Sequence, residues 1–229
     1  MKKFGLLLFF VIGLISCDSD EGNKMYVKGQ IKGFKKGTFY LQKDQDSTRV
    51  SVDSVEVMGK ETFILTDLID SPEIYYLKLG KSTKSIPFFA EKDTIQISSS
   101  LDKFEIRAVI KGSENQDLLN EYREIERKFN NQDLDMIKER FEAIQSNSQD
   151  SIDAVESRQL NALKKKYLFA TNFAIRHADK EVAPYLALTA IPGATFQILD
   201  TINNSLTPEV KASKYGRELQ KRIDGFGKK

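Results

Sequence analysis

The sequence predicts an α+β protein, in which an antiparallel β unit over residues 25–112 is followed by a helical region over residues 113–229. Between Met25 and Lys111, apolar residues alternate with polar ones and turn signals recur at short intervals, which is typical of half-buried strands. After Gly112 the apolar spacing changes to three and four residues, the period of an amphipathic helix. We expect the β unit to form an antiparallel sandwich or a curled sheet.

The first sixteen residues have the organisation of a secretory signal. Lys2 and Lys3 precede an uncharged run over residues 4–15, which is too short to span a bilayer, since a spanning helix needs roughly 20 apolar residues. The run ends in Leu14-Ile15-Ser16-Cys17, the pattern of a lipobox, in which the Cys thiol accepts a diacylglycerol before the signal is cut. An ordinary signal peptide with a chance cysteine is the alternative.

We expect Cys17 to become the lipidated N-terminus, with residues 17–24 as a polar tether and the membrane as a partner. This places the protein in the cell envelope, on the outer membrane, with the periplasmic and surface faces both open. Cys17 is the only cysteine of the sequence. Once it is acylated, the mature chain offers no thiol for a disulfide, a redox dithiol or a thiolate metal site.

The charge balance argues against nucleic acid as a partner. The chain has 35 Lys and Arg against 33 Asp and Glu, and two of the cations are Lys2 and Lys3 of the signal. The mature chain is therefore formally neutral, whereas affinity for nucleic acid depends mainly on neutralising phosphates. The basic run Lys164-Lys165-Lys166 falls in a predicted helix, where we expect a solvated face.

The predicted strands follow one another with short turns between them. Their apolar positions are Val27 to Ile31, Phe39 and Leu41, Val50 and Val52, Val55 and Val57, Phe63 and Leu65, Ile74 to Leu79, Ile95 and Ile97, and Phe104 to Ile110.

The first predicted helix begins at Ser113 and Gln116, which are spaced as a capping box. Two apolar stripes follow, and the spacing slips between them at residues 130–133, which we interpret as a kink or break. The first stripe is Leu118, Tyr122, Ile125 and Phe129, and the second is Leu134, Ile137, Phe141 and Ile144.

A second long helix is expected from Asp150 or Ser151 to about Arg176, with its most buried part at residues 167–175. Shorter helices are expected around residues 184–190 and 196–202, and Thr207-Pro208-Glu209 is a strong start signal for the last helical segment.

The order of several short segments resembles a known family, the domain of unknown function at the N-terminus of thiol–disulfide oxidoreductase lipoproteins of Gram-negative bacteria. In those relatives a thioredoxin-like domain with a Cys-X-X-Cys centre follows, and no residue of this sequence matches that centre. The resemblance implies a membrane-tethered module on the periplasmic side or the surface that has lost, or never had, its redox partner in the same chain. A protein of a redox pathway is one candidate partner that the family's usual fusion suggests. The matching segments are residues 27–33, 38–41, 52–55, 72–77, 86–91 and 206–210, with Tyr215-Gly216.

Catalytic, metal and cofactor sites are not expected. His177 is the sole histidine and stands near the end of the second long helix, where a favourable interaction with the helix dipole explains it better than catalysis. Asp44, Asp46 and Asp53 are conceivable calcium ligands, but the segment lacks the glycine and terminal glutamate of a calcium loop. We interpret it as a solvated hairpin loop.

The segment Ile86-Pro87-Phe88-Phe89 is the candidate for a partner contact. Proline in a strand favours a sheet edge, and adjacent phenylalanines on a strand point to opposite faces. Core packing is the favoured interpretation for Phe88 and Phe89, and an edge that accepts a partner's strand is the alternative.

We expect a non-enzymatic envelope module that binds a partner or ligand. The alternative is an enzyme with an unrecognised, cysteine-free site. A deep pocket with clustered carboxylates would favour the enzyme, and an apolar patch beside an open strand edge would favour binding.

Overall fold

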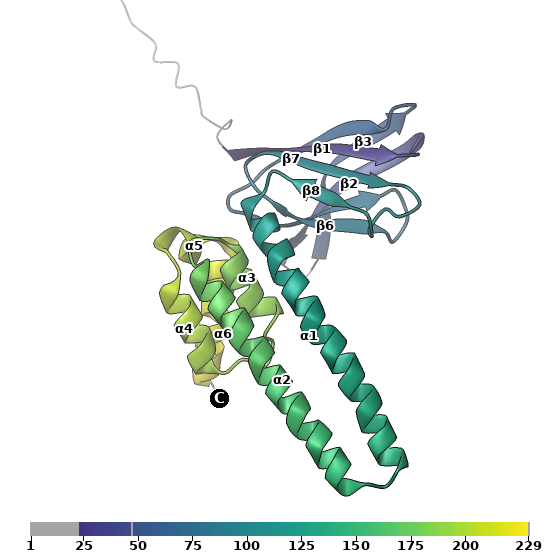
Figure 1. Cartoon of the computed structure of the whole chain (residues 1–229). Coiled ribbons are helices and arrows are strands. Elements are labelled where there is room, and N and C mark those ends of the chain that lie inside the picture. The colour runs from purple at the N-terminus through teal and green to yellow at the C-terminus, as the bar shows by residue number, and fades with distance from the viewer. Residues whose placement is uncertain (1–22, 47, 229) are drawn as a thin grey trace, which may run out of the picture.

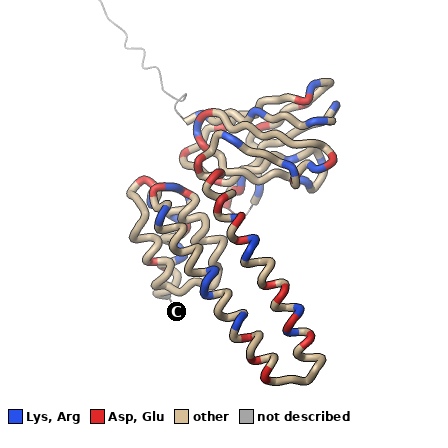
Figure 2. The backbone as a smooth tube through the Cα atoms, in the orientation of Figure 1, with Lys and Arg blue, Asp and Glu red and all other residues tan. Residues whose placement is uncertain are grey.

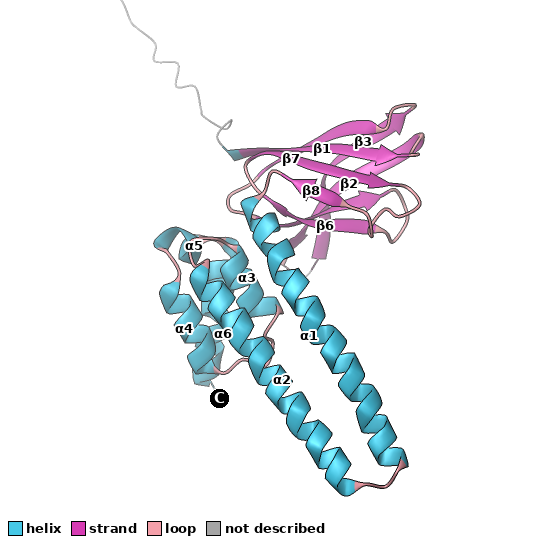
Figure 3. Ribbon diagram, viewed as in Figure 1, coloured by secondary structure: helices cyan, strands magenta, loops and turns pink. Residues whose placement is uncertain are grey.

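The computed structural model describes residues 23–46 and 48–228, and it confirms the α+β class: two β-sheets are followed by helices (Figure 3). The predicted signal over residues 1–16 and the predicted lipidation site Cys17 lie outside the described residues, as does most of the tether.

Eight strands form two four-stranded sheets that pack face to face. One sheet has the order β4-β1-β7-β8 and the other β3-β2-β5-β6. The strands are β1 (Lys24–Lys32), β2 (Lys36–Gln45), β3 (Thr48–Met58), β4 (Thr62–Leu68), β5 (Glu73–Leu79), β6 (Ser85–Ala90), β7 (Asp93–Ser100) and β8 (Val109–Lys111).

The prediction of a wholly antiparallel unit was wrong for one pair. β7 runs parallel to β1, because the chain leaves the second sheet after β6 and re-enters the first sheet alongside β1. The predicted strand from Phe104 to Ile110 was also too long. Residues 102–107 form turns that leave Ile106 86% exposed, and β8 begins at Val109.

A β-bulge explains why the alternation of valines changes phase in β3. Asp53 pairs with Leu41 of β2, but the next pair joins Ser51 to Gln42, so Val52 is an extra residue on its strand. An extra residue moves all later side chains to the other face of the sheet. The valines of this single strand are therefore even-numbered before the bulge (Val50 and Val52) and odd-numbered after it (Val55 and Val57).

The helical half is a long hairpin with a cluster of short helices packed against its base (Figure 1). The helices are α1 (Glu114–Gln145), α2 (Gln149–Arg176), α3 (Val182–Thr189), α4 (Phe196–Ser205), α5 (Pro208–Ala212) and α6 (Lys214–Asp224), followed by the 3₁₀ turn η2 (Gly225–Lys228). Thr207 caps α5 and Pro208 begins it, as predicted. Among the described residues, no helix combines the length and apolarity that membrane crossing would need.

The predicted kink or break at residues 130–133 was wrong, because α1 continues through it as one helix of 32 residues and shows no bend there in Figure 1. Phe129 and Leu134 are five residues apart, so the second stripe is rotated by roughly 140° around the helix from the first. The first stripe faces α2 and the helix cluster. The second stripe, which begins at Leu134, stays exposed, and Met136 and Ala143 point inward in its place.

The two halves share the sheet that contains β5 and β6. Phe88 lies in the core between the sheets, whereas Phe89 lies in the helical core, and both rings are 0% exposed. The Phe89 ring meets the rings of Tyr185 and Tyr215 edge-on, with centroids 5.4 and 6.0 Å away. The outer face of this sheet is therefore covered by the helices around Ile74 and Phe89, since successive side chains of a strand point to opposite sides.

We predict that Phe88→Ala and Phe89→Ala each lower the free energy of unfolding by roughly 3–5 kcal/mol, because each leaves a cavity in a closed core. Urea denaturation followed by circular dichroism measures the loss. Leu168→Ala, at a side chain that is 61% exposed and lies away from the second stripe of α1, is the control and should change stability by less than about 0.5 kcal/mol. A loss below about 1 kcal/mol at both core positions would contradict this packing.

Candidate functional site

The N-terminus of α1 is attached to the β unit by a half-buried carboxylate. Glu91, just after β6, accepts hydrogen bonds from the Ser113 hydroxyl (2.8 Å) and from the backbone N–H of Asn115 (2.7 Å) and Glu114 (3.3 Å). These donors have no partner within the helix, and a carboxylate also complements the positive end of the helix dipole. Ser113 caps the N–H of Gln116 as predicted, at 3.0 Å.

The other half of the predicted capping box is replaced by a contact between the two halves. The Gln116 side chain does not return to Ser113; its Oε1 accepts the backbone N–H of Phe89 in β6, at 2.8 Å. The neighbouring Asn115 side chain accepts the N–H of Val182 (2.7 Å) and donates to Glu181 (3.0 Å). Both amide residues are at most 2% exposed, so these bonds are made away from water.

This arrangement closes the sheet edge that the sequence suggested as a binding site. β6 is an edge strand, as the proline predicted. Its outward donors are nevertheless occupied, because the N–H of Ser85 bonds to Glu105 (2.9 Å), the N–H of Phe89 bonds to Gln116, and Pro87 has none. With both phenylalanine rings buried, the contact that Phe89 makes outside the β unit is with the chain's own helices.

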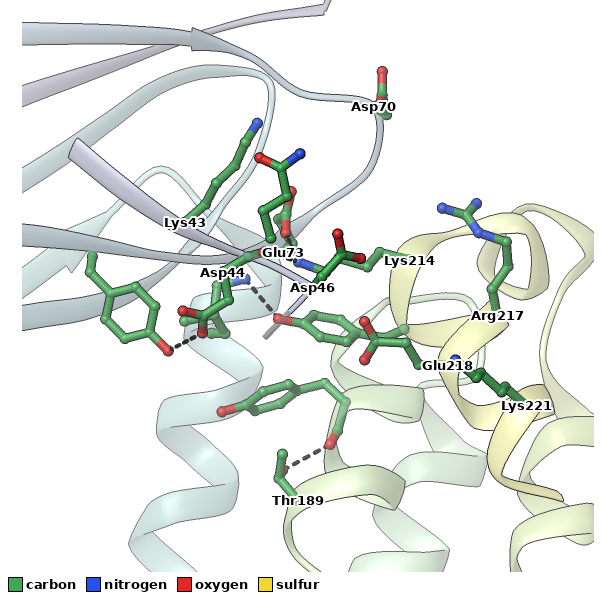
Figure 4. A pocket seen from close by; sticks show the side chains of 15 residues that line it. Lys43, Asp44, Asp46, Asp70, Glu73, Thr189, Lys214, Arg217, Glu218 and Lys221 are labelled. Carbon is green, nitrogen blue, oxygen red and sulfur yellow. Dashed lines mark hydrogen bonds and ion pairs between the residues drawn. The ribbon is translucent and has the colours of Figure 1, made fainter. Parts of the chain in front are cut away.

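A cleft of about 870 Å³ opens between the β2–β3 hairpin and the helix cluster (Figure 4). Its walls come from the end of β2 and the start of β5 on one side and from α3 and α6 on the other. The lining residues are Lys43, Asp44, Gln45, Asp46, Asp70, Glu73, Ile74, Tyr76, Tyr185, Thr189, Lys214, Tyr215, Arg217, Glu218 and Lys221.

The inner charges of the cleft pair with one another across the junction. Lys214, at the start of α6, forms an ion pair with Glu73 and donates to the backbone carbonyl of Asp44 at 2.8 Å. Tyr215 receives the backbone N–H of Ile74 on its hydroxyl, at 3.0 Å. These bonds hold the helix cluster against β2 and β5, so this part of the cleft is a structural contact.

Asp44 stands at the mouth of the cleft in a second cluster. Arg49 bonds to its carboxylate at 2.9 Å and lowers the pKa of Asp44, and the Tyr76 hydroxyl donates to the same group at 3.0 Å. The Arg49 guanidinium also lies over the Tyr76 ring, 3.3 Å from its centroid. Burial, with the bond to Asp44, raises the pKa of Tyr76 to about 12. Tyr76 therefore stays protonated at neutral pH and acts as a donor.

The remaining candidate residues do not come together as a site. Asp44 and Asp46 line the cleft, whereas Asp53 accepts the backbone N–H groups of Ser54 and Thr66, both at 2.7 Å. His177 caps the C-terminus of α2 and packs on Phe173 with ring centroids 4.5 Å apart. Within residues 23–46 and 48–228, no group of His, Cys, Asp or Glu is arranged to hold a metal ion.

The outer part of the hairpin has an exposed apolar surface. The sequence analysis identified the α1 part of it as an amphipathic stripe but did not predict that the stripe would be exposed. We call this surface the distal apolar face. Its members are Leu134 (65% exposed), Ile137 (58%), Phe141 (61%) and Ile144 (46%) of α1, with Leu160 (53%) and Leu163 (48%) of α2.

Two ion pairs set the level at which α1 and α2 meet. Arg140 pairs with Glu156 at 3.0 Å, and Arg158 pairs with Glu139. This antiparallel register puts Leu160 and Leu163 level with Ile137 and Leu134.

The distal apolar face continues the surface that the helix cluster covers near the base of the hairpin. Ile137 is eighteen residues, or about five turns, from Leu119, and Leu163 is eleven residues, or about three turns, from Ala174. Leu119 and Ala174 are both buried in the helical core. The same side of the hairpin is therefore covered at the base and open toward the tip.

Residues 25–119 match a family model described as a domain of unknown function, DUF4369. This segment of the chain is similar to the DUF4369 family. The match confirms the domain that the sequence resembles and spans the β unit together with the first turns of α1, including Glu91, Asn115 and Gln116. No curated protein and no solved structure matches the chain. The outer hairpin and the helical wall of the cleft lie beyond the DUF4369 match.

We predict that the contribution of Glu181 to stability falls as pH rises above about 4.5, the ordinary pKa of this residue. Burial raises the pKa of Glu181 in the folded state, although the bond from Asn115 opposes the shift. The folded state therefore binds the proton more tightly than the unfolded state, and stability is lost as the group ionises.

Glu181→Gln should flatten this part of the profile, because the amide keeps an acceptor for Asn115 and carries no charge. The measurement is the free energy of unfolding in urea between pH 4 and 7 for both proteins. Identical slopes would contradict the assignment.

Proposed function

We propose that the protein is a non-catalytic lipoprotein of the cell envelope that binds another polypeptide through the distal apolar face. The observation that carries the proposal is the exposure of six large apolar side chains on one side of a projecting hairpin. Soluble monomers rarely expose apolar patches of more than a few hundred Å², and larger ones commonly mark interaction sites. Core packing does not explain these residues, because the inside of the outer hairpin is filled by Met136, Ala143 and Val155.

The position of the hairpin suits an anchored protein. The described chain starts at β1 in the β unit, and the hairpin tip points away from that unit (Figure 1). α1 has 32 residues, which corresponds to roughly 48 Å of helix at 1.5 Å per residue. With a lipid on Cys17 and a short tether, the hairpin would extend the binding surface away from the outer membrane.

The cleft gives less support to the alternative of an enzyme. Its carboxylates do not form an isolated cluster: Glu73 is paired with Lys214, and Asp44 with Arg49. The first pair joins the two halves of the chain and the second lies within the β2–β3 hairpin. Catalysis would instead require these groups to be directed at a bound substrate. A role beside thiol–disulfide proteins rests on the family resemblance.

We predict that a photo-cross-linking amino acid at position 141 captures a polypeptide in intact cells, whereas the same group at position 168 does not. Phe141 and Leu168 are both 61% exposed on the hairpin, but Leu168 is rotated by roughly 140° around α2 from Leu163. The readout is a band of raised mass on an immunoblot after irradiation. No adduct at position 141, or equal adducts at both positions, would refute the proposed surface.

We predict that Cys17→Ser abolishes incorporation of labelled lipid and leaves the signal uncut at this site, because the thiol is the group that is acylated. Metabolic labelling and the mobility of the protein on a gel measure both effects. Lipid incorporation by the mutant would overturn the lipobox interpretation.

A further inference from the structure

The charges of the outer hairpin are divided along its length. The half toward the tip, residues 139–157, has five carboxylates and one cation, a formal charge of −4. The half toward the base, residues 131–138 and 158–166, has five cations and two carboxylates, a formal charge of +3. Figure 2 shows acidic residues on α2 near the tip and basic residues farther up.

The extent of the open face is set by the helix cluster. The Tyr167 hydroxyl of α2 accepts the backbone N–H of Gly193 at 3.1 Å, which marks where the cluster begins to cover the hairpin. From this level to the tip, the middle of the open face lies near Lys138 on α1 and Arg158 on α2. The change of charge occurs at the same level, so the outer hairpin has an acidic half and a basic half of similar length, which meet where Arg158 and Lys138 pair with Glu139 and Glu142.

We infer that the occupant of the distal apolar face is a second copy of this chain, with the two hairpins packed antiparallel as four helices. This inference rests on the proposed function and names its partner. A two-fold axis at the level of Lys138 and Arg158 sets the acidic half of each copy opposite the basic half of the other. A parallel arrangement would set two charges of −4 against each other, and complementary charges fix the orientation of such contacts.

The apolar side chains fit the same arrangement. Antiparallel α1 helices place Phe141 of one copy between Leu134 and Ile137 of the second copy, so every member of the stripe meets an apolar side chain. The six members, each about half exposed, supply the apolar centre of a contact, and each partner of a standard interface buries roughly 800 Å². The flanking charges supply a polar rim.

The first test measures the mass of the full-length lipoprotein, extracted in a mild detergent, by light scattering with the detergent contribution subtracted. The wild type and Leu168→Glu should have twice the mass of one chain, and Phe141→Glu should have the mass of one chain. Circular dichroism should show the same helix content in all three, because both substituted side chains are largely exposed. A wild type of single-chain mass, or a Phe141→Glu variant that remains double, overturns the second copy as occupant.

The second test determines the orientation in intact cells. Leu134→Cys and Ile144→Cys are co-expressed with different tags and treated with a short thiol cross-linker, and the wild type, with Cys17 acylated, gives the background. Antiparallel packing brings position 134 of one copy near position 144 of the other and predicts the mixed product. Products that join position 144 to itself, or no product above background, overturn the arrangement.

The two proposals fail in different ways. A single-chain mass together with a photo-adduct of position 141 to a different polypeptide rejects the second copy and keeps the proposed binding function. A double mass with an adduct to the chain itself supports both. A single-chain mass with no adduct at position 141 rejects both.

Discussion

The attachment of α1 to β6 is the contact on which the rest of the structure depends. Glu91 occupies backbone donors at the start of α1, and Gln116 bonds back to the N–H of Phe89. Because an unpaired buried backbone group costs on the order of 1–3 kcal/mol, these bonds hold the first turn of the helix in one position. The direction of α1 sets the direction of the hairpin, and the hairpin carries the base on which the helix cluster packs.

The same contact explains why one sheet is buried on both faces around Ile74 and Phe89. The sheet containing β5 and β6 faces the other sheet through Phe88 and Leu77, and it faces the helices through Ile74 and Phe89. The sheet of β1 and β4 has a solvated outer side, where Ile64 is 55% exposed. Covering one sheet with helices closes the β6 edge to strand addition and leaves the outer hairpin as the projecting part of the molecule.

A long hairpin with an open apolar side is unfavourable for a monomer in water, because burying apolar surface lowers the free energy of the system. The structure leaves this surface unburied while it fills the inside of the hairpin with smaller residues such as Ala143 and Val155. Such a division is suited to a helix pair that is stable by itself and is completed by a partner. In the pair of copies that we propose, the charge division along the hairpin would select the antiparallel orientation.

The sequence by itself determined the class of the fold and most of its elements. Period-two and period-three-to-four spacing are local properties of the chain, so the strands, the long helices, the caps at Ser113 and Thr207 and the edge position of Pro87 could all be predicted. The lipobox is equally local, and it remains a prediction because it lies outside the described residues.

Only the tertiary structure decided which apolar residues are buried. The stripe from Leu134 to Ile144 has the spacing of a core-facing stripe, yet it is exposed, because a rotation of roughly 140° at residues 130–133 turns it away from α2. Phe89, by contrast, is on an edge strand and is nevertheless buried, since helices far along the chain cover it. Spacing shows which side chains share a face, but burial depends on what packs against that face, and those neighbours are brought there by contacts such as Gln116 to Phe89 that the local sequence does not specify.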